Sequence, residues 1–88
     1  MKNAKILSKT SLTPDMIELK LETQHLELQP GQWMFIHYLK AEAPLKRAYS
    51  VADIEHHGEI SILTFLIKLL ENGKGSAQLK NLAAGDEV

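Results

Sequence analysis

The chain has 88 residues, 44% of them hydrophobic and 24% charged, which is the composition of one small soluble globular domain. Its net charge of -1 provides no basic surface, so nucleic acid is not expected as a partner. The absence of cysteine excludes disulfides and cysteine-ligated zinc or iron–sulfur sites within these residues.

The first part of the chain predicts two strands joined by a turn. Residues 4–12 can form the first strand, and the Thr-Pro-Asp segment that follows favours a turn. Residues 16–23 then alternate between apolar and polar side chains, a period of two that is typical of a half-buried strand. The apolar face of this second strand consists of Ile17, Leu19 and Leu21.

Three further strands are expected in the middle of the chain. A Pro-Gly turn at 30–31, where glycine can adopt a positive φ, leads into a strand at 33–39 that is rich in aromatic and β-branched residues. A fourth strand is expected at 47–53, and a fifth at 60–70 after a His-His-Gly-Glu turn. An apolar run such as 60–70 also suits a buried helix, but the two glycines soon after it favour a strand.

The last segment, residues 73–88, predicts a short helix. Ser76 is a favourable N-cap, and Gly85 suits the C-terminal cap. Leu79 and Leu82 share one face of this helix. The final Asp-Glu-Val is expected to begin a sixth strand, which stops at the end of the chain. Together the elements predict an all-β meander or Greek-key barrel with one short helix.

The sequence predicts neither a signal peptide nor a membrane helix. Residues 1–15 contain lysines but no apolar stretch and no small-residue cleavage site, so no signal peptide is expected. The apolar run at 60–70 is too short for a membrane helix and contains a lysine. We therefore expect a cytoplasmic protein without a membrane partner.

Two segments contain residues that could bind a ligand. A glycine-rich turn before a helix can bind an anion, and Gly75 and Ser76 suit such a site, although a serine-capped turn is the commoner reason for these residues. Arg47 and Tyr49 lie on one face of their strand, where they could be a phosphate-binding cation and a stacking ring, or a solvated arginine beside a packed tyrosine. Together the segments fit a ligand with a diphosphate and a planar ring.

Three motifs of the chain resemble those of the ferredoxin reductase-like flavoprotein family. Arg-Ala-Tyr-Ser at 47–50 looks like its Arg-x-Tyr-Ser motif, and Pro-Gly-Gln-Trp at 30–33 looks like its Pro-Gly-Gln-aromatic turn. Residues 73–88 are similar to its Gly-x-x-Ser turn and helix, with the trailing Leu-x-x-Leu-x-x-Gly-Asp-x-Val. The likeness runs from about Ala4 to Val88, with the motifs in the family's order.

The resemblance implies a six-stranded antiparallel Greek-key barrel, here one domain of residues 1–88 with a truncated last strand. It implies binding of FAD, or less often FMN, on the outer surface. Arg47 would pair with the flavin phosphates, and Tyr49 would pack against the isoalloxazine ring. Ser50 would hydrogen-bond near the reactive N5 edge, as the expected catalytic residue. Strict alternation puts Ser50 on the face opposite Arg47 and Tyr49, so this contact requires a strand edge or a twist.

The resemblance also assigns residues to the rest of the cofactor. Ser76, with the amides around Lys74 and Gly75, would hold the diphosphate. The end of the fifth strand would line the cofactor mainly through its backbone, at Leu66, Ile67 and Lys68.

The implied function is that of the flavin-binding domain of an NAD(P)H-dependent oxidoreductase, which passes electrons between a nicotinamide and an acceptor through flavin N5. The family's NAD(P)H-binding domain is not within these 88 residues. NAD(P)H would therefore act only through that domain or a separate redox partner, and we expect the chain alone to bind flavin better than it catalyses. An open edge beside the short sixth strand favours a homodimer. A small barrel that binds a protein partner without flavin would also explain the strands.

Other residues are expected to have structural roles. His56 and His57 resemble a metal-binding pair, but neighbours on a strand point apart and no third ligand is evident, so no metal site is expected. Trp33 and Phe35 are expected in the core of the barrel, and His37 is expected to be a hydrogen-bonded strand residue.

Overall fold

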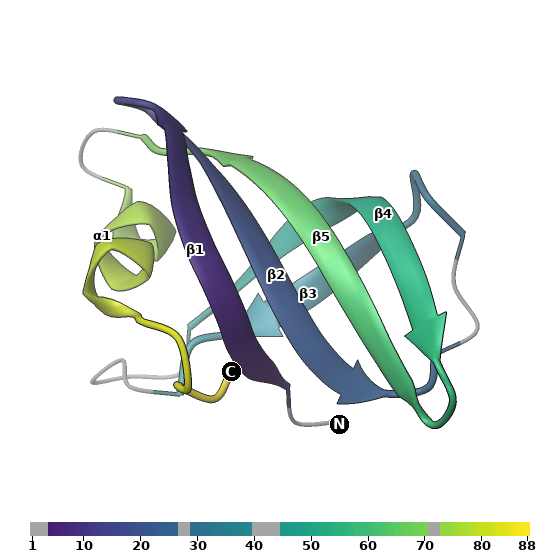
Figure 1. Cartoon of the computed structure of the whole chain (residues 1–88). Coiled ribbons are helices and arrows are strands. Elements are labelled where there is room, and N and C mark those ends of the chain that lie inside the picture. Colours follow the sequence, from purple (N-terminus) through teal and green to yellow (C-terminus); the bar gives the residue numbers. More distant parts are fainter. Residues whose placement is uncertain (1–3, 27–28, 40–44, 71–72) are drawn as a thin grey trace.

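Five strands and one helix make up the part of the chain that the structure, a computed structural model, describes: residues 4–26, 29–39, 45–70 and 73–88. The elements are β1 (Lys5–Thr13), β2 (Met16–Gln24), β3 (Trp33–His37), β4 (Lys46–His57), β5 (Ile60–Lys68) and α1 (Lys74–Asn81). The strands form one antiparallel sheet in the order β1-β2-β5-β4-β3 (Figure 1). After β3 and β4, the chain returns and places β5 beside β2, which is the strand order of a Greek key.

The core lies on the face of the sheet that the period of two predicts. Every second residue of β2 and β5 is buried, and these residues pair directly across the two strands: Ile17 with Ile67, Leu19 with Phe65, and Leu21 with Leu63. Each such side chain contributes about 1.5–3 kcal/mol when it leaves water. The prediction that 60–70 is a strand rather than a helix is confirmed, with the strand ending at Lys68.

β4 is longer than predicted because it belongs to two parts of the sheet. Its first residues, from Lys46 to Ser50, pair with β3, and the pairing with β5 begins at Val51 opposite Phe65. A register shift follows between Val51 and Asp53, as in a β-bulge, which bends a strand and increases its twist. In Figure 1, β3 and the start of β4 accordingly pass behind β1, β2 and β5. The bend separates the candidate ligand-binding half of β4 from the half that completes the core sheet.

The predicted turn between the fourth and fifth strands is shorter than expected. His56 and His57 belong to β4, and the turn consists of Gly58 and Glu59. The positive φ of 65° at Gly58 is the conformation that glycine adopts most easily. The positive φ predicted for Gly31 is confirmed, at 94°.

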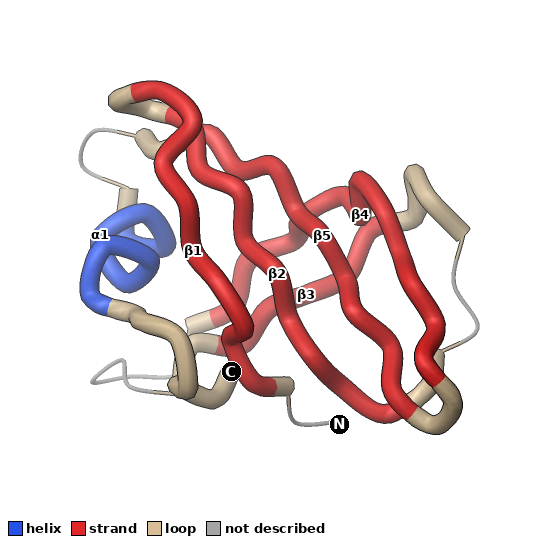
Figure 2. The backbone as a smooth tube through the Cα atoms, in the orientation of Figure 1, coloured by secondary structure: helices blue, strands red, loops and turns tan. Residues whose placement is uncertain are grey.

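The two predicted caps of the helix are wrong, whereas its buried face is confirmed. The N-cap is Gly73 instead of Ser76, because the Ser76 hydroxyl accepts a hydrogen bond from the Leu70 N–H at 2.7 Å. The C-cap is Leu82 instead of Gly85, which lies in the following turn. Both Leu79 and Leu82 are buried, as their spacing predicted. The Lys9 ammonium donates to the Leu79 carbonyl at 2.7 Å, and Figure 2 shows α1 beside β1.

The last residues of the chain lie along the outer edge of β1. The Ile6 N–H donates to the Asp86 carbonyl at 2.8 Å, and the Val88 N–H donates to the Ala4 carbonyl at 2.9 Å. Among the described residues no strand joins this segment to β3, so the sheet is not closed into a barrel there. A cavity of about 270 Å³ lies at this side, lined by residues of β2, β3 and β5 together with Ala4 and Val88.

The prediction that Trp33 and Phe35 belong to the core is wrong. Their side chains are 62% and 45% exposed, whereas Ile36 is buried. The two rings meet edge to face with centroids 5.2 Å apart, and the Lys46 ammonium lies 4.5 Å from the centre of the Phe35 ring. The faces of β3 are therefore the reverse of those predicted: Ile36 faces the core, and Trp33 and Phe35 form an exposed aromatic pair on the outer face.

Candidate functional site

The residues of the Arg-Ala-Tyr-Ser segment are divided between the two faces of β4. Arg47 lies opposite the buried Ile36, so Arg47 and its i+2 neighbour Tyr49 share the face of β4 on the side of Ile36, where Arg47 is exposed and Tyr49 is half-buried. Ser50 lies opposite Trp33 on the outer face, and its side chain is exposed. The alternation predicted from the sequence is therefore confirmed. Ser50 directly precedes Val51, where the pairing with β5 begins, so it lies beside the bend of β4.

Tyr49 belongs to a small aromatic group beneath the first half of β4. Its half-buried ring and the ring of Phe65 meet edge to face, with centroids 6.5 Å apart and planes at 70°. Its hydroxyl shares a hydrogen bond with the hydroxyl of Tyr38, a buried residue just after β3. Burial, together with this hydrogen bond, raises the pKa of Tyr38 well above its ordinary value, and the positive charge of Arg47 acts in the opposite direction. Arg47 therefore lies near enough to this pair to influence its charge.

β5 and β4 diverge next to the Arg-Ala-Tyr-Ser segment of β4. The ladder between the two strands ends at the pair of Val51 and Phe65, and residues 66–68 continue beside β2. Within the described residues, the β4-facing edge of this stretch has no ladder partner in β4. The side chains of Leu66 and Lys68 are exposed, whereas that of Ile67 is buried. The backbone of residues 66–68 is therefore paired with β2 on one side, and the two strands β4 and β5 diverge around it.

The first turn of α1 presents free backbone donors. The first bond of the helix runs from the Ala77 N–H to the Gly73 carbonyl at 3.0 Å, so the N–H groups of Lys74, Gly75 and Ser76 have no acceptor within the helix. This turn contains no acidic residue, and the helix dipole adds positive potential. A helix start of this kind has the polarity that favours an anion.

Ser76 can serve the helix and a ligand at the same time. Its hydroxyl oxygen accepts the Leu70 N–H, and the hydroxyl proton can still be donated to another acceptor. A Cβ at Gly73 would lie 3.3 Å from the Ser76 Oγ and 3.2 Å from the Leu70 Cβ, which is a tight approach. Glycine at 73 therefore allows Leu70, just after β5, and the start of α1 to be joined through Ser76.

Substitutions at Ser76 are expected to separate these two roles. Ser76→Ala should lower the free energy of unfolding by about 1 kcal/mol, because the Leu70 N–H loses its acceptor. Ser76→Asp retains an acceptor, but Ser76 is buried, so the larger charged side chain should also lower the free energy of unfolding, and its negative charge would oppose a phosphate. We therefore expect Ser76→Asp to bind FAD more weakly than Ser76→Ala, by isothermal titration. Equal affinities of the two variants would contradict a phosphate site at this turn.

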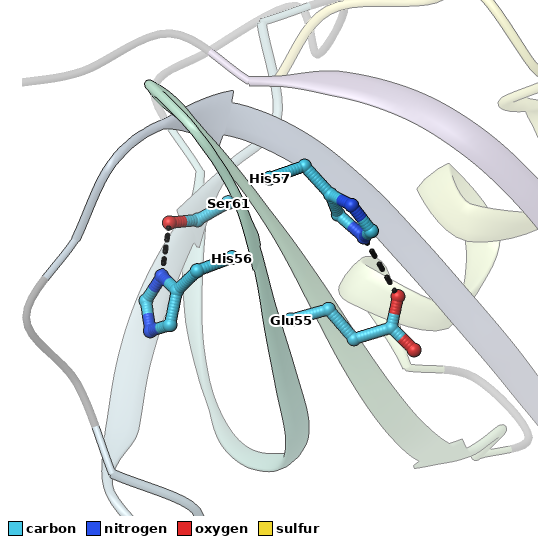
Figure 3. A network of polar contacts seen from close by, with 4 residues as sticks. All are labelled: Glu55, His56, His57 and Ser61. Carbon is cyan, nitrogen blue, oxygen red and sulfur yellow. Dashed lines mark hydrogen bonds and ion pairs between the residues drawn. The ribbon is translucent and has the colours of Figure 1, made fainter.

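The histidines of β4 point to different partners, as their adjacent positions predicted. Figure 3 shows His56 with its Nδ1 3.1 Å from the Ser61 Oγ, and His57 with its Nε2 3.2 Å from the Glu55 Oε2. The ring of His25 lies against that of His56, with centroids 4.5 Å apart. Within the described residues, no group of three or more histidine, aspartate or glutamate side chains is arranged to hold a metal ion. In the same part of the chain, no helix has the length and apolarity needed to cross a membrane.

Sequence reasoning missed Tyr38, which the fold brings against the candidate site. It lies eleven positions before Tyr49, and the motif that contains Tyr49 gives no signal of it. The contact depends on the pairing of β3 with β4, since Met34 lies opposite Tyr49 and Tyr38 follows on the same face. The sequence signal that points to Tyr38 is its position in the strand expected at 33–39, before Tyr49: it follows Met34, the partner of Tyr49, by an even number of residues and so lies on the same face.

Comparison with known proteins assigns the chain to a family. Residues 3–88 match the family model described as oxidoreductase FAD-binding domain. The chain therefore belongs to the ferredoxin reductase-like FAD-binding domains of oxidoreductases, as its three motifs predicted.

A curated relative with a stated role is also similar to this chain. It is the protein named dihydroorotate dehydrogenase B (NAD(+)), electron transfer subunit, from Streptococcus mutans, with 28% identity over 87 residues. The match covers 98% of this chain and 32% of the relative, so the chain spans about a third of that protein's length.

Proposed function

We propose that this chain is the FAD-binding domain of an NAD(P)H-dependent oxidoreductase and that it binds FAD along the start of β4, the end of β5 and the start of α1. One observation carries the proposal: Arg47 and Tyr49 share a face of β4 at the point where that strand diverges from β5. The N–H groups at the start of α1, which have no acceptor within the helix, would provide a second anion-binding element.

The residues present fit the chemistry of FAD. The backbone N–H groups of Lys74, Gly75 and Ser76 would donate to the diphosphate, with the Arg47 guanidinium as a further donor. Tyr49 would pack against the flavin ring system. When bound, FAD supplies the capacity to accept and release electrons.

Ser50 has a separate proposed role, at the N5 edge of the flavin ring. Its hydroxyl is exposed on the outer face of β4, next to the bend that begins at Val51. From there it would hydrogen-bond to N5 and orient the ring for electron transfer. Because Ser50 and Tyr49 lie on opposite faces, the ring would have to lie across the edge of the bent strand.

We further propose that the sheet belongs to a six-stranded barrel. The sixth strand would continue the segment at 85–88 and pair with the free side of β3, which would cover the cavity between them. Two observations support this proposal: residues of this segment already hydrogen-bond to β1, and Val88 and β3 line the same cavity. A second copy of the chain would be the alternative partner for this edge, in a homodimer.

The wider activity is also a proposal. A domain for NAD(P)H, or a separate redox partner, would exchange electrons with the flavin, and the assembly would work in the cytoplasm. The exchange of electrons is supported by the family of the chain and by a relative whose name describes an NAD(+)-linked electron transfer subunit. FMN would be a weaker ligand than FAD, since it lacks the diphosphate for which the start of α1 is suited.

The absorbance spectrum of the purified protein, before and after addition of FAD, tests the flavin proposal. We expect visible flavin absorbance that stays with the protein on gel filtration, and affinities that fall in the order FAD, FMN and riboflavin as phosphate is lost. A protein that retains none of the three flavins would overturn the proposal. It would favour a protein-interaction module, for which the exposed pair of Trp33 and Phe35 offers a surface.

A further inference from the structure

The shared hydrogen bond between Tyr38 and Tyr49 has a direction that burial determines. Two hydroxyls joined by one bond include one donor and one acceptor. The Tyr38 side chain is only 3% exposed, whereas that of Tyr49 is half-buried. If Tyr49 donated, the buried proton of Tyr38 would have no acceptor among the described residues, and an unsatisfied buried donor is costly. The difference in burial therefore favours Tyr38 as the donor and Tyr49 as the acceptor.

Two features keep Tyr38 in this role. Its backbone N–H donates to the Leu45 carbonyl at 2.9 Å, which ties it to the residue just before β4. Burial raises the pKa of its hydroxyl, and the bond to Tyr49 acts in the same direction, so the donor proton is retained at neutral pH. Within the described residues, no buried side-chain nitrogen or oxygen lacks a hydrogen-bond partner.

The direction of the bond determines what Tyr49 can do. When its oxygen accepts the hydrogen bond from Tyr38, the hydroxyl proton of the half-buried Tyr49 remains available to donate to another acceptor. A hydroxyl whose oxygen accepts a hydrogen bond is polarised and becomes a better donor. The Tyr49 ring also meets the buried Phe65 ring in an edge-to-face contact. Both the position of the ring and the direction of its hydroxyl are thus set from the core.

We propose that Tyr38 is a positioning residue for FAD, which holds the Tyr49 ring in place and directs the Tyr49 hydroxyl proton toward an oxygen of the flavin's side chain beside Arg47. The inference rests on the proposed function, because it requires FAD at this face of β4. Tyr38 itself would not touch the cofactor; its effect passes through Tyr49.

The test is a double-mutant cycle measured by FAD titration. Tyr38→Phe retains the buried ring and removes only the hydroxyl, and we expect it to raise the Kd for FAD about twofold to tenfold. Tyr49→Phe should raise it by at least as much. In the double variant, Tyr38→Phe should add no further loss, because it acts only through the Tyr49 hydroxyl. The same Kd ratio in both backgrounds, or an unchanged Kd in Tyr38→Phe, would overturn the proposal.

Ser61→Ala is the matched control for loss of a buried hydroxyl. Ser61 lies at the other end of β5, where its oxygen accepts the Leu26 N–H at 3.0 Å. This variant should lose stability in thermal unfolding without a change in the Kd for FAD. A similar rise in Kd would show that general loosening explains Tyr38→Phe and would overturn the proposal.

A second measurement needs no flavin. In proton NMR of the wild type, the Tyr38 hydroxyl proton should exchange slowly with water, and a slowly exchanging proton on Tyr49 instead would reverse the donor and overturn the proposal. A wild type that binds no FAD would refute the proposed function and this inference together. FAD binding without coupling between Tyr38 and Tyr49 would refute the inference alone.

Discussion

Replacement of Phe65 by alanine is expected to lower the free energy of unfolding by about 3–5 kcal/mol. Phe65 is 1% exposed and is paired with both Leu19 of β2 and Val51 of β4, so its side chain lies where the two parts of the sheet meet. A small domain has a total stability of roughly 5–15 kcal/mol, so the variant should be marginally folded. Urea denaturation followed by circular dichroism measures the loss.

Leu66→Ala is the matched control, since it removes a similar apolar side chain from the next position. The Leu66 side chain is 51% exposed on the opposite face of β5. Its removal should change the free energy of unfolding by no more than about 0.5 kcal/mol. Equal losses at positions 65 and 66 would mean that the inner face of β5 has been assigned incorrectly.

Arg47→Ala is expected to weaken FAD binding about tenfold to a hundredfold, because a hydrogen bond to a charged group contributes about 1.5–3 kcal/mol. The fold should persist, since the Arg47 side chain is exposed and its one described hydrogen bond is to the neighbouring Lys46 carbonyl. Fluorescence titration of FAD gives the dissociation constant, and thermal unfolding checks the fold.

Lys46→Ala provides a control with the same change in charge. Lys46 is the neighbour of Arg47, but its ammonium packs over the Phe35 ring on the outer face of the sheet. Loss of this cation should reduce FAD affinity far less, through long-range electrostatics alone. If both variants lose affinity equally, the effect of Arg47 comes from the overall charge of the surface, and Arg47 does not contact the cofactor.

The fold was predictable from sequence where only one face of a strand is apolar. In β2, charged residues alternate with Ile17, Leu19 and Leu21, so the buried face is unambiguous. In β3, apolar side chains occupy both faces, and the period of two does not distinguish Trp33 and Phe35 from Met34 and Ile36. The assignment of Trp33 and Phe35 to the core failed for that reason, because pairing with β4 sets the phase.

The candidate site was predictable as a set of residues but not as an arrangement. The motifs select Arg47, Tyr49 and Ser50, and strand alternation gives their faces. Serine commonly caps helices, but here the Ser76 hydroxyl is engaged by the Leu70 N–H, just after β5, and the helix begins two residues earlier, at Lys74. Tyr38 could not be found from local pattern, because its contact with Tyr49 arises from tertiary pairing.

The split pairing of β4 implies that its two halves differ in how readily they open. Residues 53–57 pair with β5, which is itself paired with β2, whereas residues 46–50 pair with β3, which lies at the end of the strand order. Amide hydrogens near the end of a sheet exchange with water through local openings that cost less free energy than the opening of a central strand. The half of β4 that carries Arg47 and Tyr49 thus belongs to the less protected part of the sheet. A ligand bound there would slow exchange in β3 and early β4 while leaving β2 unchanged.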